Sequence, residues 1–327
     1  MRRLSLLVLL VVGLPLAASA QELRLPNKPG SVKFAVIGDS GEPGKGQTAI
    51  ANQMAKWLAP YKYEFVLMLG DNLYGRESAN DYQKKFEIPY KALLSAGVKF
   101  YAALGNHDDA EQRLYKHFNM NGEKYYSFKP KAGVRFFAID SNYVDDKQLQ
   151  WLDKELAASG SDWKIAFFHH PLYSSGETHG SADLQRGLLE PIFLKYGVNV
   201  VMSGHEHFYE RVKPQKGVAY FTIGSSAKLR PGDLRKSEMT LYGNDREYMF
   251  MLVEIDGDEM FFQAINEKGT TIDAGSIRRV GKVEQPTQNS TTQPVVPQAK
   301  PSPTQPGPAT GTTGQTPAKP APQRPAK

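Results

Sequence analysis

Short apolar runs recur along the chain, and each run stops abruptly at a polar turn. The five clearest runs cover residues 34–37, 65–69, 100–104, 165–168 and 198–202. A short run that is apolar at every position is typical of a β-strand buried on both faces, as in the parallel sheets of α/β proteins. The pattern therefore predicts an extensive buried sheet.

Segments between these runs carry apolar residues at the three- and four-residue spacing of amphipathic helices. These residues are Ile50, Met54, Trp57 and Leu58 in one segment, Leu149, Leu152 and Leu156 in a second, and Leu184, Leu188 and Ile192 in a third. We expect the second helix to begin with a cap near Asp145, and the third to be kinked or interrupted at Pro191. Residues 248–255 and 260–265 flank Asp256-Gly257-Asp258 and predict a β-hairpin. This alternation predicts an α/β domain with much parallel strand pairing.

The first twenty residues have the features of a secretory signal peptide. Arg2 and Arg3 precede an apolar run over 4–16, and Ala18-Ser19-Ala20 fits a cleavage site. The run is shorter than the roughly 20 residues that a membrane-spanning helix needs, so we expect no transmembrane anchor. Cleavage near Ala20 would send the protein to the periplasm or the medium, and the two arginines leave twin-arginine export open.

Residues 283–327 differ in composition from the rest of the chain. They hold half of its 22 prolines together with Thr, Gln, Ala and Lys, and they contain no aromatic residue. Such a segment buries too little apolar area to offset the entropy of ordering it, so we expect a disordered tail. The tail is interpreted as a solvated spacer, or as a weak contact to the cell wall or another surface. Residues 22–282 remain as one catalytic domain.

Charge and cysteine content narrow the chemistry. The formal net charge is +6, but the leader and the tail carry most of it and leave the domain at about +1. The basic isoelectric point therefore does not indicate nucleic-acid binding, and we expect none. Cysteine is absent, which excludes disulfides, thiolate ligands and a cysteine nucleophile. Any metal must be bound through nitrogen and oxygen.

A polar cluster follows each of the five apolar runs. The clusters are 38–41 (GDSG), 70–74 (GDNLY), 105–108 (GNHD), 169–171 (HHP) and 204–207 (GHEH). Sites in α/β sheets form at the carboxyl ends of strands, so five such ends point to one shared cavity. We expect each glycine to let the backbone turn sharply after its strand. His205 and His207 are two residues apart and can face the same way.

This series resembles the calcineurin-like metallophosphoesterases, and within them the tartrate-resistant type of purple acid phosphatase. The resemblance covers most of residues 31–280 and extends to 125–140 (YYSFKPKAGVRFFAID), 148–156 (QLQWLDKEL) and 169–174 (HHPLYS). Gly41 stands where the wider superfamily usually has a histidine, and Tyr74 follows Asp71 by three residues, an exchange that marks the purple phosphatases. The resemblance implies a four-layer α-β-β-α sandwich of two mixed β-sheets flanked by helices.

The resemblance also implies two metal ions bridged by Asp71. One ion would be held by Asp39, Asp71, Tyr74 and His207, and the other by Asp71, Asn106, His169 and His205. A phenol with a pKa near ~10 ionises readily only beside a hard, highly charged ion, which favours Fe(III) in the first set. The second set suits Fe(II), Zn(II) or Mn(II).

The implied reaction is hydrolysis of a small phosphate monoester by a metal-bound hydroxide. His107 is the candidate proton donor to the leaving group, with Asp108 beside it to orient it, and His179 resembles a family histidine that contacts the phosphate. His170 is interpreted as supporting the ligands. His117 is interpreted as part of an amphipathic helix, and Tyr125, Tyr126 and Trp151 as core aromatics.

Two other functions remain open from the sequence. A phosphodiesterase or nucleotide hydrolase could use the same metals. A non-catalytic metal- or surface-binding protein is disfavoured, because no position of the ligand series is missing.

Overall fold

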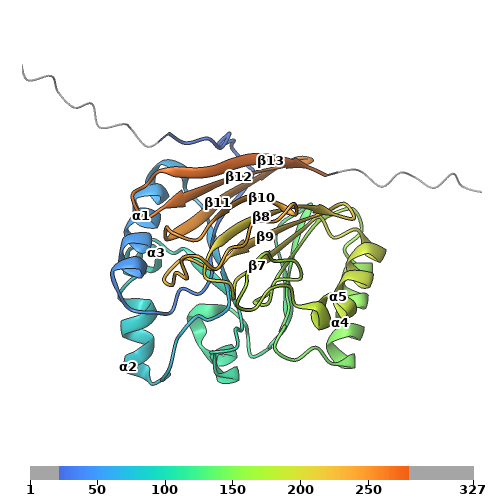
Figure 1. The fold of residues 1–327 in the computed structure, drawn as a ribbon, viewed down its shortest axis with the longest axis horizontal. Helices are drawn as coiled ribbons and strands as arrows, with labels where there is room; N and C mark the ends of the chain where they lie inside the picture. Colours follow the sequence, from blue (N-terminus) through green and yellow to red (C-terminus); the bar gives the residue numbers. More distant parts are fainter. Residues whose placement is uncertain (1–21, 280–327) are drawn as a thin grey trace, which may run out of the picture. The chain divides into compact units, whose positions relative to one another are not determined.

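The computed structural model describes residues 22–279. Two β-sheets are packed face to face, with α1, α2 and α3 on one side of the molecule and α4 and α5 on the other (Figure 1). This is the predicted four-layer α-β-β-α arrangement, and that prediction is confirmed. The predicted signal peptide, 1–20, and tail, 283–327, lie outside the described residues.

The first sheet has six strands in the order β13-β12-β11-β1-β2-β3. Its strands are β1 Val32–Ile37, β2 Phe65–Leu69, β3 Lys99–Ala103, β11 Met249–Asp256, β12 Glu259–Asn266 and β13 Thr271–Arg278. Strands β1, β2 and β3 are parallel, and β11, β12 and β13 extend the sheet as an antiparallel meander. The β11–β12 pair is the predicted hairpin.

The second sheet has seven strands in the order β10-β8-β9-β7-β6-β5-β4. Its strands are β4 Tyr126–Lys131, β5 Val134–Ala138, β6 Trp163–Phe167, β7 Val200–Ser203, β8 Tyr209–Gln215, β9 Val218–Ile223 and β10 Thr240–Asn244. Strands β5, β6, β7 and β9 are parallel, while β4, β8 and β10 pair antiparallel.

Helices α1, α4 and α5 are longer than the others. They are α1 Lys45–Tyr61, α2 Ala79–Tyr82, α3 Lys91–Ser95, α4 Asp146–Ala157 and α5 Asp183–Tyr196, with single turns η1 Gln83–Glu87, η2 Ala110–Leu114 and η3 Lys116–Phe118. Helix α4 begins as predicted, since the Asp145 side chain accepts a hydrogen bond from the Gln148 N–H. No helix within 22–279 is both long and apolar enough to cross a membrane.

The period of two along the strands explains why the central runs are apolar at every position. In β6, Ile165 and Phe167 face the core between the sheets, whereas Ala166 and the following Phe168 face the helices α4 and α5. Aromatic rings join the sheets, and the ring centroids of Phe34 and Phe136 are 5.1 Å apart. Both faces of β6 are therefore buried, as the runs predicted.

Two local predictions need correction. Helix α5 is not interrupted at Pro191 but continues through it. Proline inside a helix costs about 3 kcal/mol, and burial of Leu189 and Phe193 contributes about as much in the opposite direction. His117 lies in the three-residue 3-10 turn η3 and not in an amphipathic helix. Asn119 takes a left-handed φ of 50° and ends that turn.

Candidate metal centre

The carboxyl ends of five strands converge at one end of the two sheets. Strands β1, β2 and β3 bring their loops from the first sheet, and β6 and β7 bring theirs from the second. Backbone hydrogen bonds tie the loops within each sheet, from Asp39 N–H to Gly70 O and from Gly204 N–H to His169 O. Between the sheets, the His205 N–H donates to Asp39 Oδ2 over 2.8 Å. The five predicted clusters therefore form one site.

Sharp turns were expected at every glycine before these residues, but only Gly70 has the positive φ of such a turn, whereas Gly105 and Gly204 allow close packing. A Cβ on Gly105 would lie 2.2 Å from Asp71 Oδ1, and one on Gly204 would lie 2.6 Å from Asp39 Oδ2. Among these glycines Gly70 does have a positive φ, of 90°, and positive φ also occurs at Asp39 (φ 52°), Asp71 (φ 51°) and His205 (φ 72°). Strain of this kind gathers at functional sites.

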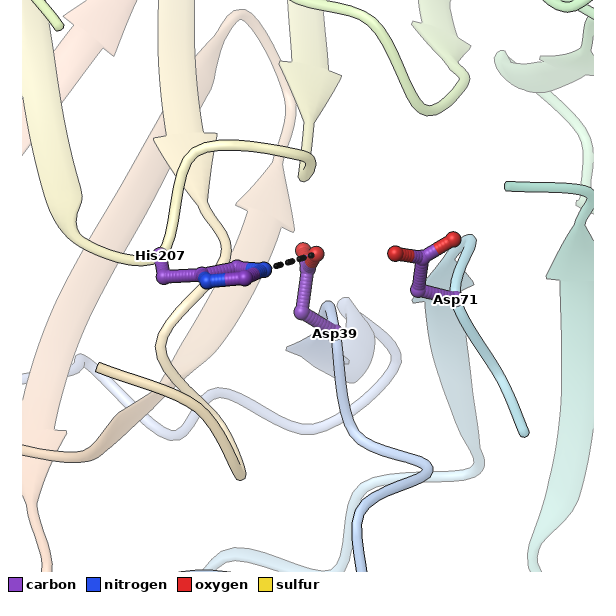
Figure 2. Close-up of side chains that lie close together, drawn as sticks. All are labelled: Asp39, Asp71 and His207. Carbon is purple, nitrogen blue, oxygen red and sulfur yellow. Dashed lines mark ion pairs between the residues drawn. The ribbon is translucent and has the colours of Figure 1, made fainter. Parts of the chain in front are cut away.

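One group of donor atoms is formed by Asp39, Tyr74, His207 and Asp71. The Tyr74 hydroxyl donates to Asp39 Oδ1 over 3.1 Å and lies 3.3 Å from His207 Nε2. His207 Nε2 is 3.4 Å from Asp39 Oδ1 (Figure 2). Ligand atoms of Asp39, Asp71 and His207 all lie within 4.8 Å of one another.

A second group surrounds His169 and shares Asp71 with the first. His169 Nε2 lies 3.4 Å from Asp71 Oδ1, 3.0 Å from Asn106 Oδ1 and 3.1 Å from His205 Nδ1. Metal–ligand bonds of about 2.0–2.2 Å place neighbouring ligand atoms about 3.0–3.5 Å apart. The distances of 3.0–3.4 Å within each group are therefore those expected between neighbouring ligand atoms of one cation per group.

The protonation of His169 tests whether these residues suit a metal. His169 Nδ1 is 2.9 Å from the Leu69 carbonyl oxygen, which can only accept, so Nδ1 carries the proton. Burial lowers the pKa of His169, so Nε2 presents a lone pair. That lone pair faces the Asp71 carboxylate and the Asn106 oxygen, both acceptors. A cation between these atoms would bind all three at once, and a carbonyl that accepts from the other ring nitrogen is the usual partner of a metal-bound histidine.

The pKa shifts in the first group also indicate that its residues suit a metal ion. Burial, followed by the charge of Asp71, raises the pKa of Asp39. Burial lowers the pKa of His207 to about 4, which leaves the imidazole neutral and able to bind metal. Burial and both carboxylates raise the pKa of Tyr74, so ionising this phenol requires a strong positive charge beside it.

His107 and Asp108 follow Asn106 but lie differently. The exposed His107 ring is 5.0 Å from the Tyr74 ring, and its backbone N–H donates to Asp71 Oδ1. The Asp108 carboxylate accepts hydrogen bonds from backbone N–H groups of Gly105, Asn72 and Leu73 and from the Gln112 amide. Within the described residues Asp108 makes no hydrogen bond to the His107 ring, so it fixes the loops and not that imidazole.

Three histidine rings pack against one another at tilted angles at the other side of the site. The ring of His205 lies between those of His170 and His179, with centroid distances of 4.5 Å and 4.2 Å. His170 Nδ1 contacts Ser141 Oγ at 2.9 Å, while His179 is exposed beside the second donor group. His117, by contrast, packs among aromatic rings of the first-sheet side.

Sequence reasoning missed several residues that contact the site. Lys228 Nζ stands 4.0 Å from the centroid of the Tyr74 ring, and no motif marks it. Asn72 is buried and donates to Ala103 O and Asp108. Glu206 is fully buried between two candidate ligands, and burial raises its pKa to about 7. Its place inside the GHEH cluster was the one available signal.

Comparison with known proteins places the fold and the site in a family context. Residues 32–209 match the family described as Calcineurin-like phosphoesterase. The chain is 26% identical over 298 residues to tartrate-resistant acid phosphatase type 5 of Rattus norvegicus, covering 76% of this chain and 91% of the rat protein. It is 28% identical over 241 residues to purple acid phosphatase 17 of Arabidopsis thaliana, covering 63% and 71% of the two chains. Among solved structures, Plasmodium GAP50 shares the fold with a TM-score of 0.69 at 21% identity, covering 77% of this chain and 90% of that one.

Proposed function

Because this chain belongs to the calcineurin-like phosphoesterases and is a metal-dependent hydrolase of phosphate esters, we propose that it is an exported phosphomonoesterase of the purple acid phosphatase type. The observation that carries the proposal is the position of His169 Nε2, 3.4 Å from Asp71 Oδ1 and 3.0 Å from Asn106 Oδ1. The named relatives act as acid phosphatases, and the phenol of Tyr74 is placed at the first donor group.

We assign two metal ions to the two donor groups. The first would be held by Asp39, Asp71, Tyr74 and His207, and the second by Asp71, Asn106, His169 and His205. The first set is rich in oxygen and includes a phenol, which suits Fe(III). The second set, with two imidazoles and an amide, suits Fe(II), Zn(II) or Mn(II). Asp71 is the shared carboxylate, since its oxygens approach atoms of both groups.

The bound metals would lower the pKa of a water and neutralise charge on the phosphoryl oxygens. The protein's own groups complete the reaction. His107 is exposed beside Tyr74 and would supply the proton that the departing alkoxide needs. His179 stands over His205 and donates to a phosphoryl oxygen, which orients the ester.

Export is proposed from the leader, in which Arg2 and Arg3 precede an apolar run and Ala18-Ser19-Ala20 fits a cleavage site. Sequencing the N-terminus of protein recovered from periplasm or medium tests it. A mature chain that starts at Gln21 supports export, and an intact leader on cytoplasmic protein contradicts it.

Metal analysis combined with a substrate panel tests the assignment. Purified protein should contain two metals per chain and should hydrolyse 4-nitrophenyl phosphate faster than bis(4-nitrophenyl) phosphate. The reverse preference would favour the phosphodiesterase alternative. Asp71→Asn should lose at least one metal and lower turnover roughly 10²-fold or more. Asp153→Asn, an exposed carboxylate that pairs with Lys195, serves as the control and should keep both properties.

A further inference from the structure

The segment that carries His179 is tied to buried carboxylates on either side of that residue. The N–H of Thr178 and its hydroxyl both donate to Asp233 Oδ1. The N–H of Gly180 donates to Glu206 Oε1 over 2.6 Å. The residues immediately before and after His179 are therefore each fixed by a separate acidic side chain.

The side chain of Glu206 packs against this segment. Its side chain is fully buried, and a Cβ added to Gly176 would lie 2.3 Å from Glu206 Oε1. The carboxylate thus occupies the space that any larger residue at position 176 would need. Gly176 also forms a bridge with Leu234, which draws the segment against the loop that contains Asp233.

Arg230 links the two carboxylates to a candidate metal ligand. Its Nη1 lies 3.8 Å from Glu206 Oε2 and 3.4 Å from Asp233 Oδ2. Its backbone N–H donates to the His207 carbonyl over 3.2 Å. Glu206 Oε2 makes no hydrogen bond within the described residues, so the guanidinium is the group that compensates this buried oxygen.

We propose that Glu206 is a positioning residue that holds the backbone at His179, so that the imidazole stands over His205 before substrate arrives. This inference rests on the proposed function, in which His179 orients the phosphate. A loop ordered in advance spares the free energy of ordering it on binding. A shift of about 1 Å in such a group can lower rates 10²-fold. Loss of Glu206 should therefore weaken substrate binding without removing metal.

The first test compares Glu206→Ala with Glu206→Gln and a matched control. Glu206→Ala should raise KM for 4-nitrophenyl phosphate about tenfold with metal content unchanged. Glu206→Gln should restore most of the affinity, because its amide oxygen can still accept from Gly180. The control is Glu254→Ala, since Glu254 is equally buried and accepts from the N–H groups of Asn27 and Lys28 at the opposite end of the sheet. This variant should leave KM unchanged.

A double-mutant cycle separates positioning from general damage. His179→Ala should raise KM, and adding Glu206→Ala to it should raise KM little further, because both changes remove the same contact. A Glu206→Ala effect of equal size in both backgrounds overturns the proposal, as does a Glu206→Ala variant with wild-type KM.

Hydrogen–deuterium exchange of the peptide covering 174–181 gives a readout that needs no turnover. Exchange there should accelerate in Glu206→Ala and in Gly176→Ala, which keeps the carboxylate but displaces it, and not in Glu254→Ala. Unchanged exchange in the folded variants contradicts the proposal. If the wild type hydrolyses no phosphate ester, the proposed function falls while exchange still decides what Glu206 holds. If it is active and His179→Ala keeps its KM, the role of His179 and the positioning proposal fall together, while the phosphatase activity stands.

Discussion

At the scale of single residues, candidate ligands occupy backbone conformations that L-amino acids rarely adopt. Asp39, Asp71 and His205 have φ between 51° and 72°, and a non-glycine residue in this region costs on the order of 1–3 kcal/mol. Neighbouring groups hold them there, since the His205 N–H donates to Asp39 and the His107 N–H donates to Asp71. The surrounding loops therefore keep these candidate ligands in a strained backbone conformation that points their side chains into the site.

The phenol of Tyr74 provides a spectroscopic test at this scale. The iron-loaded protein should absorb visible light through charge transfer from the Tyr74 phenolate to Fe(III). Tyr74→Phe keeps the ring under Lys228 but removes the oxygen 3.1 Å from Asp39, so the band should disappear. Tyr143→Phe, at a side chain 75% exposed, should keep it. A band that survives Tyr74→Phe in iron-replete protein would show that another residue supplies the phenolate.

The candidate metal ligands could be predicted from the sequence, but the residues that position their loops could not. The donors could be found because each follows an apolar run, and parallel strands bring their ends together. Glu206 and Asp233 could not be assigned, because their partners Gly180 and Thr178 lie 26 and 55 residues away in sequence. Contacts of that kind depend on loop paths, which no local pattern encodes.

At the scale of elements, local signals predicted five central strands, one hairpin and the start of α4, but not strands such as β4, β8 and β10. Strand pairing depended on distant parts of the chain. The β11–β12 hairpin followed from its turn, and α4 from its cap. The division of strands into two sheets did not follow from periodicity, because a run buried on both faces looks the same in either sheet. Strand β9, for example, joins β7 in parallel and β8 in antiparallel pairing. The layering came from the family resemblance.

The cap of α4 gives a prediction for element stability. Asp145 accepts from the Gln148 N–H over 2.8 Å, so Asp145→Ala should destabilise the fold by about 1 kcal/mol and lower Tm by about 2–4 °C. Asp146→Ala is the matched control, since Asp146 lies in the same first turn and its side chain makes no hydrogen bond or ion pair within residues 22–279. Thermal unfolding of both variants measures the difference. Equal losses would assign the effect to charge and not to the cap.

At the scale of the whole molecule, the candidate metal centre joins the two sheets. Asp39, Asp71, Tyr74 and Asn106 come from loops of the first sheet, and His169, His205 and His207 from loops of the second. Neither sheet alone could complete either donor group. Metal binding should therefore stabilise the packing of one sheet on the other.

Chelation should reveal this coupling as a loss of stability. A metal that binds the folded chain at about 1,000 times its Kd stabilises it by about 4 kcal/mol, which corresponds to about 8–16 °C in Tm for a domain of this size. Removing the metals with a chelator should lower Tm by that order, and restoring iron and zinc should reverse the change. Asp71→Asn should respond less to the chelator, because Asp71 belongs to both donor groups. Asp153→Asn should respond as the wild type does. A Tm that is indifferent to chelation in protein shown to have lost its metal would mean that the sheets are held together by their aromatic core alone, with the ions adding chemistry but no structural link.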